Sequence, residues 1–93
     1  MSVVSDRLLE IRRATMPDDS LVTYAEFIGL GPNVYRKYEN GEERVPQDIV
    51  STISGRIGLP REIVDGTEKF DDFYKFFCRL VISQWRGREY PEI

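Results

Sequence analysis

The sequence has no histidine, a single cysteine and no long apolar run, and each absence excludes a class of protein. Without histidine the chain lacks the usual general base at neutral pH and the commonest metal ligand, so histidine-based catalytic triads are excluded. Cys78 alone forms neither an internal disulfide nor a cysteine-rich zinc site, which fits a reducing compartment. No stretch approaches the roughly 18 apolar residues of a membrane span, and the N-terminal residues do not form a secretory signal. We expect a cytoplasmic protein with no membrane contact, metal or cofactor.

The chain is also short and slightly acidic. Its 93 residues suit one small domain, and a chain of this size buries little more than about 60% of the surface that its unfolded form exposes. It carries 13 Lys and Arg against 16 Asp and Glu, a net charge of −3. Indiscriminate binding to polyanions draws its free energy from many cations, so any contact with nucleic acid must come from a local patch. The carboxylate pairs are adjacent in sequence and point in different directions on a helix, and we expect no enzyme activity.

Short helices joined by tight turns are predicted throughout, and strand-like alternation is sustained nowhere. Ser20 is a natural N-cap, Gly29 supplies a left-handed stop, and Pro32 suits the first position of a helix. The expected helices start at a cap on Ser5 or Asp6, then cover 21–28, 32–39, 46–57 and 61–65, and end with a long helix from Thr67 or Asp71 to about Trp85.

The terminal helix is apolar nearly all round, which indicates burial on several sides. In a small domain one side can face the core, and the other is exposed unless it meets a second copy or a partner. We therefore divide the chain into a domain over 1–66 and a terminal helix and tail over 67–93, packed on the same domain as a dimerisation element. The residues expected at the dimer contact are Phe70, Phe73, Tyr74, Phe77, Leu80, Val81 and Trp85.

Residues 20–41 have the layout of a helix-turn-helix unit, because two short helices are separated by a turn of about three residues. Ala25 lies where the two helices cross, and a larger side chain there would push them apart. The marks are a hydroxyl cap at Ser20, Ala25, Gly29, Tyr38-Glu39-Asn40-Gly41, Arg44 and Pro46. With these residues the chain resembles the phage-repressor and Cro type of helix-turn-helix, the XRE family, from about Arg7 to Asp65.

The resemblance implies an all-α, repressor-like domain of five or six helices that binds double-stranded DNA as a dimer. In this family type the third helix lies in the major groove, and two half-sites are about 34 Å apart. Carried over by position, the base-facing residues are Pro32, Asn33 and Arg36, flanked by Val34 and Lys37, while Lys37, Asn40 and Arg44 hold phosphates. Leu21 is a further predicted DNA contact, and it and Pro32 would touch thymine methyl groups. The implied function is a sequence-specific transcriptional repressor.

A second interpretation remains open. Leu21 and Pro32 are apolar at positions where the family often has polar, base-reading side chains, and residues 1–48 hold 6 basic and 9 acidic groups. Both features suit a helix-turn-helix scaffold that binds a protein partner, as an antitoxin, an antiactivator or a phage inhibitor does, through an acidic surface. In a third interpretation, the aromatic terminal helix docks in the groove of another protein.

Overall fold

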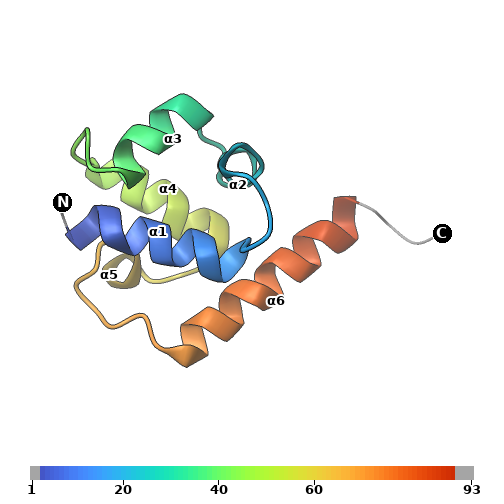
Figure 1. Ribbon diagram of the computed structural model, residues 1–93. Helices are drawn as coiled ribbons and strands as arrows, with labels where there is room; N and C mark the ends of the chain where they lie inside the picture. The colour runs from blue at the N-terminus through green and yellow to red at the C-terminus, as the bar shows by residue number, and fades with distance from the viewer. Residues whose placement is uncertain (1–2, 90–93) are drawn as a thin grey trace.

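The computed structural model describes residues 3–89, with side chains as far as Arg86. This part of the chain contains six α-helices (Figure 1). The helices are α1 (Val3–Thr15), α2 (Leu21–Ile28), α3 (Pro32–Glu39), α4 (Gln47–Ile57), α5 (Arg61–Val64) and α6 (Asp72–Glu89). Over these residues there is no strand. The prediction of an all-α fold with five or six helices is confirmed.

The caps that the sequence predicted set several of the helix boundaries. The Ser20 side chain accepts a hydrogen bond of 3.2 Å from the backbone N–H of Thr23, which caps α2. Gly29 ends α2 with φ 79°, a left-handed conformation that glycine adopts without a Cβ clash. Asp71, one of the two caps considered for the last helix, accepts from the N–H of Tyr74 at 3.2 Å. The bounds of α2 and α3 match the prediction.

The start of α1 differs from the prediction, and so does the role of Ser5. The helix already includes Val3, so Ser5 and Asp6 lie inside it and neither caps it. Ser5 is 1% exposed, and its Oγ donates a 2.8 Å hydrogen bond to the carbonyl oxygen of Tyr38 at the end of α3. The same carbonyl also accepts from the N–H of Gly41 at 3.3 Å, so Ser5 adds a second hydrogen bond at the end of α3. This serine therefore makes a tertiary hydrogen bond, which its position near the start of a helix does not indicate.

The core lies where all six helices meet. Ala25 is fully buried beside α3, as the crossing of two helices requires, and the rings of Tyr24 and Tyr35 lie 5.5 Å apart. Residues at 2% exposure or less include Leu8, Ile11, Tyr24, Ala25, Ile28, Tyr35, Val50, Ile53, Ile57 and Val64. The predicted apolar face of α4 is confirmed by three of its four members, and Ile49 is only half-buried.

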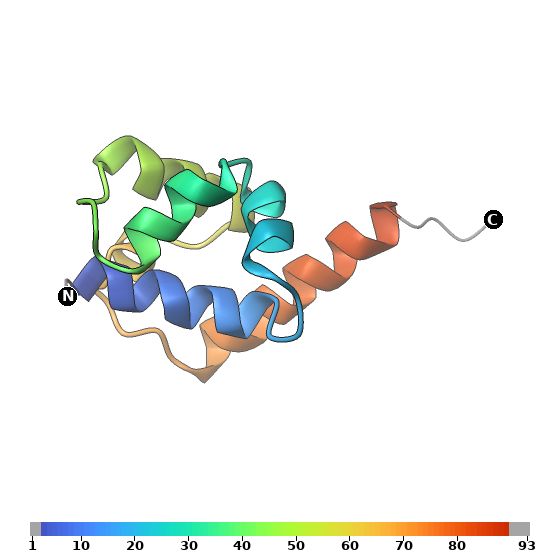
Figure 2. The same ribbon diagram turned by 45° about the horizontal axis from the view of Figure 1, so that its top comes forward.

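The long helix α6 packs against α1 on the side away from α3, and its later turns reach past α1 towards α2 (Figures 1 and 2). Cys78 and Ile82 are buried in this contact. Near the end of the helix, the ring of Trp85 meets Phe27 of α2 edge-on, with 5.1 Å between ring centroids. The terminal helix is therefore packed on the helices that precede it.

Candidate nucleic-acid interface

The α2–α3 unit has the spacing that the sequence predicted. Residues 29–31 separate the two helices, and the N–H of Leu30 donates to the carbonyl oxygen of Ala25 at 2.9 Å. Gly31 then has an extended backbone, and Pro32 opens α3 without leaving an unpaired N–H. In Figure 2, where the top of the molecule is turned forward, α3 lies across the near side of the molecule.

The inner face of α3 is held by two tyrosines. Tyr35 is fully buried and Tyr38 is 8% exposed. The hydroxyl of Tyr35 donates to the carbonyl oxygen of Leu8 in α1 at 3.3 Å. Burial raises the pKa of Tyr35 well above its ordinary value of 10, so the phenol stays a neutral donor even in alkaline solution. The rotation of α3 about its axis is thereby fixed by its packing.

An ion pair anchors the last turn of α3. The guanidinium of Arg12 in α1 donates two hydrogen bonds to the Glu39 carboxylate, Nε to Oε2 and Nη2 to Oε1, each 2.8 Å long. The side chains are 20% and 9% exposed, respectively. The hydrogen bond to Glu39 raises the pKa of Arg12 despite the opposing effect of burial. Glu39 is therefore neutralised on the inner side of α3 and adds no free negative charge to the outer side.

The outer side of α3 is exposed at Asn33, Val34, Arg36 and Lys37. The predicted DNA-facing residues thus share one helix, and the tyrosines between them turn inward. Pro32, at the first position of the helix, is half-buried. This arrangement brings together the base-facing residues that the resemblance implied, and it leaves the Asn33 and Arg36 side chains accessible.

The loop after α3 folds back on the end of the helix. The N–H groups of Glu42 and Glu43 donate to the carbonyl oxygen of Lys37 at 2.9 and 3.2 Å, and Asn40 Oδ1 accepts from Glu42 N–H at 3.1 Å. This fold places the Glu43 carboxylate 3.8 Å from the Lys37 ammonium, with both side chains about half exposed. Arg44 follows in the loop and is exposed. Lys37 thus has an acidic neighbour, while Arg36 and Arg44 form no ion pair with the described residues.

Two valines add apolar surface to the helix-turn-helix unit. Leu21 is half-buried and packs against the core, whereas its neighbour Val22 is 49% exposed. Val34 in α3 is 46% exposed. The sequence analysis named Leu21 and missed Val22. The signal for Val22 was available in the helical spacing, because it stands two positions before the buried Tyr24 and points elsewhere.

The exposed apolar residues of α6 differ from those predicted for the dimer contact. Phe73, Phe76 and Leu80 are 69%, 59% and 48% exposed. Their spacing of three and four residues places them on one helix face, which we call the α6 apolar stripe. Phe76 was absent from the predicted dimer contact. Tyr74, Phe77, Val81 and Trp85 are half-buried and pack against the core of their own chain.

Phe70, which the sequence placed at the dimer contact, is buried within its own chain. Phe70 is 5% exposed, and it precedes α6, which begins at Asp72, so it does not follow the helical register of the stripe. The guanidinium of Arg7 lies 5.8 Å from the centre of its ring, and the Lys75 ammonium lies 6.0 Å away. These cations cover a ring that helps to close the core beneath α1.

Comparison of the chain with protein-family models, curated proteins and solved structures finds no match. None of the helices in the described range is long and apolar enough to span a membrane.

Proposed function

We propose that this protein is a sequence-specific regulator of repressor type that binds double-stranded DNA as a dimer, with α3 in the major groove. The observation that carries the proposal is the two-sided character of α3. Tyr35, Tyr38 and the Arg12 pair anchor its inner side, while Asn33 and Arg36 are left exposed on its outer side. A rigid helix with free hydrogen-bonding side chains is what major-groove readout requires. A cytoplasmic location, where DNA is accessible, is part of the proposal.

The exposed side chains suit distinct parts of a DNA site. Asn33 matches adenine and Arg36 matches guanine, each through paired hydrogen bonds. Arg44 and Lys37 would bind phosphates, together with the first backbone N–H groups of α2, which have no partner within the helix. The Lys37–Glu43 pair is half exposed and such a pair contributes only about 0–1 kcal/mol, so a phosphate can replace the carboxylate.

The dimer would form through the α6 apolar stripe. Antiparallel pairing of two copies of α6 buries both stripes about a twofold axis. Charge favours the same arrangement, because Asp72 lies at the start of the helix and Arg79 lies two turns later, and both are exposed. In an antiparallel pair the acidic start of one helix therefore approaches the basic part of the other.

The DNA proposal is tested by selecting bound duplexes from a random pool and measuring their affinity by fluorescence anisotropy. We expect Asn33→Ala and Arg36→Ala each to weaken binding to the selected duplex by about 1–3 kcal/mol, or roughly 5- to 150-fold in Kd. Arg44→Ala should weaken binding to all duplexes alike. It should also lower the slope of log K against log salt concentration by about one. The matched control is Arg13→Ala, an exposed cation on α1. The proposal is overturned if Asn33→Ala and Arg36→Ala bind the selected duplex as tightly as the unchanged protein does.

The dimer is tested separately by light scattering. Phe76→Asp places a charge in the centre of the stripe and should convert the dimer to a monomer. Val22→Asp changes another exposed apolar residue, on α2, and should leave the mass unchanged. A wild-type chain that is monomeric at high concentration would contradict the dimer.

A protein-binding scaffold is the second candidate. The observations that favour it are the Glu43 carboxylate beside Lys37 and the exposed Val22 and Val34 in the helix-turn-helix unit. Apolar side chains ringed by charge are common at protein interfaces. If the selection yields no duplex, and a protein partner is lost on Val34→Asp but kept on Phe76→Asp, this candidate replaces the DNA proposal.

A further inference from the structure

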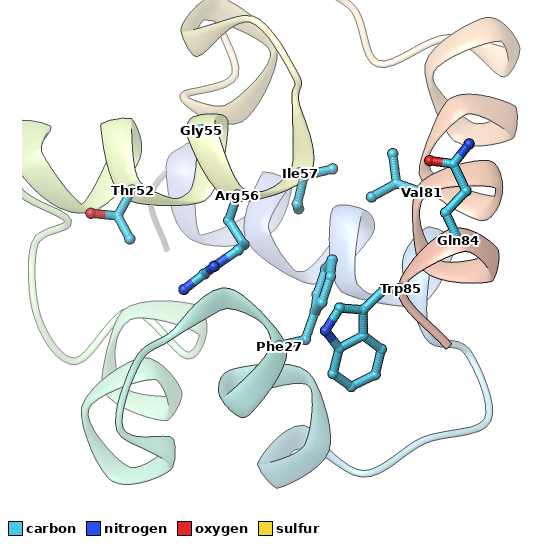
Figure 3. Close-up of a pocket in the computed structure, with 8 residues that line it drawn as sticks. All are labelled: Phe27, Thr52, Gly55, Arg56, Ile57, Val81, Gln84 and Trp85. Atoms are coloured by element: carbon cyan, nitrogen blue, oxygen red, sulfur yellow. The ribbon is translucent and has the colours of Figure 1, made fainter. Parts of the chain in front are cut away.

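A groove with a volume of about 530 Å³ lies between α2, α4 and α6 (Figure 3). This volume falls within the roughly 300–1,000 Å³ of typical small-molecule sites. The lining residues come from all three helices and are Phe27, Thr52, Gly55, Arg56, Ile57, Val81, Gln84 and Trp85. The groove is separate from the outer face of α3, and the proposed function assigns it no role.

One part of the groove is apolar and aromatic. Phe27 and Ile57 are almost fully buried and form its base, and Val81 and Trp85 of α6 are half-buried. The Trp85 ring stands edge-on to Phe27 at a centroid distance of 5.1 Å (Figure 3). Half-buried apolar side chains around a fixed aromatic pair suit a planar apolar body, which gains both burial and ring contacts.

The other part of the groove is cationic. Arg56 extends from α4 beside the end of α2, where its Nη2 atom lies 2.9 Å from the point that a Cβ on Gly29 would occupy. The carbonyl end of α2 attracts a cation, which explains this position. Arg56 forms no hydrogen bond or ion pair with the described residues, and no carboxylate is among those that line the groove. Its planar fork of donors is therefore available to an anion.

We propose that the groove binds a small organic acid that has an aromatic or bulky apolar body and one carboxylate. The body would pack on the exposed parts of Val81 and Trp85, above the buried Phe27, and the carboxylate would accept hydrogen bonds from Arg56. The ligand would touch α2, the first helix of the helix-turn-helix unit, and α6, the proposed dimer helix. An effect of the ligand on DNA binding rests on the proposed function, but its binding to the groove does not.

Trp85 is the only tryptophan of the chain, so its fluorescence reports on the groove directly. The probe is phenylacetate, titrated into the full-length protein, and we expect a saturable change in emission. Phenylacetamide, which has the same body without the charge, should bind about tenfold more weakly, since hydrogen bonds to charged groups are the stronger ones.

The variant Arg56→Gln removes the guanidinium and should also weaken phenylacetate binding about tenfold. Arg13→Gln makes the same change of charge on α1, outside the groove, and should leave the affinity unchanged. Circular dichroism checks that both variants keep the helical fold. The proposal is overturned if phenylacetate gives no saturable change, or if Arg56→Gln binds it as tightly as Arg13→Gln does.

Duplex binding measured with and without saturating phenylacetate separates the two proposals. Saturable, Arg56-dependent binding in a chain that selects no duplex supports the groove and overturns the DNA function. If the chain binds a duplex through Arg36 but does not bind phenylacetate, the DNA function is supported and the groove proposal is overturned. A shift in duplex affinity that disappears in Arg56→Gln supports regulation through the groove.

Discussion

The ion pair between Arg12 and Glu39 links the first helix to the end of α3, and removing its carboxylate should destabilise the whole domain. In Glu39→Ala two charge-assisted hydrogen bonds of 2.8 Å are lost. The Arg12 guanidinium, only 20% exposed, is left without its counter-charge. Breaking a fully buried pair in this way costs about 3–5 kcal/mol. Because Arg12 retains some access to water, we expect about 2–3 kcal/mol here.

The measurement is urea and thermal unfolding followed by circular dichroism. For a domain of this size, 2–3 kcal/mol corresponds to a fall in Tm of roughly 8–24 °C. The double variant Arg12→Met, Glu39→Met removes both charges and fills the space with apolar atoms. It should be more stable than the sum of the two single losses predicts, with a coupling energy of about 1–3 kcal/mol.

The matched control is Glu43→Ala, which removes the partner of Lys37 from a pair whose side chains are about half exposed. Exposed pairs contribute about 0–1 kcal/mol, so the loss should be small. If Glu39→Ala proves no more destabilising than Glu43→Ala, the Arg12 pair does not anchor α3, and only Tyr35 and Tyr38 hold the helix in place.

Two further predictions concern the buried tyrosines and the turn. Burial raises the pKa of Tyr24 and Tyr35 well above 10, so the folded state keeps two protons that the unfolded state releases. The free energy of unfolding should fall as the pH rises above about 10, and the two tyrosines contribute up to about 2.7 kcal/mol per pH unit to this slope. Burial also raises the pKa of the Cys78 thiol, which adds to the slope, so Tyr35→Phe should lower it by about 1.4 kcal/mol per pH unit in alkaline unfolding curves. Gly29→Ala forces a Cβ into φ 79° and should cost about 1–2 kcal/mol, whereas Gly55→Ala, in open space within α4, should stabilise by about 0.5–1 kcal/mol in the same assay.

Local chemistry made much of the fold predictable. Ser20, Gly29, Gly58 and Asp71 act through hydrogen bonds or backbone conformations within a few residues of themselves, so their roles can be recognised along the chain. The apolar spacing of α4 depends only on helical geometry. Ser5 shows the limit, because its hydroxyl serves the carbonyl of Tyr38, 33 positions away. Sequence spacing carries no record of such a partner.

The candidate site divides in the same way. The residue types on α3 and the inward turn of Tyr35 and Tyr38 were accessible from periodicity, since buried and exposed positions alternate with the helical turn. The Lys37–Glu43 pair and the Arg12–Glu39 pair were not, because each depends on how a loop or another helix approaches α3. The same holds for the groove, whose lining residues come from three separate helices.

The caps and the helical periodicity determined by themselves that this chain forms short helices with a two-helix unit at its centre, because these effects act over one or two turns. Only the tertiary structure decided which side of α6 faces water. The sequence showed a helix that is apolar nearly all round, and packing against α1 and Phe27 then covered one side and left Phe73, Phe76 and Leu80 exposed. Burial is a property of neighbours in space, and the sequence lists only neighbours along the chain.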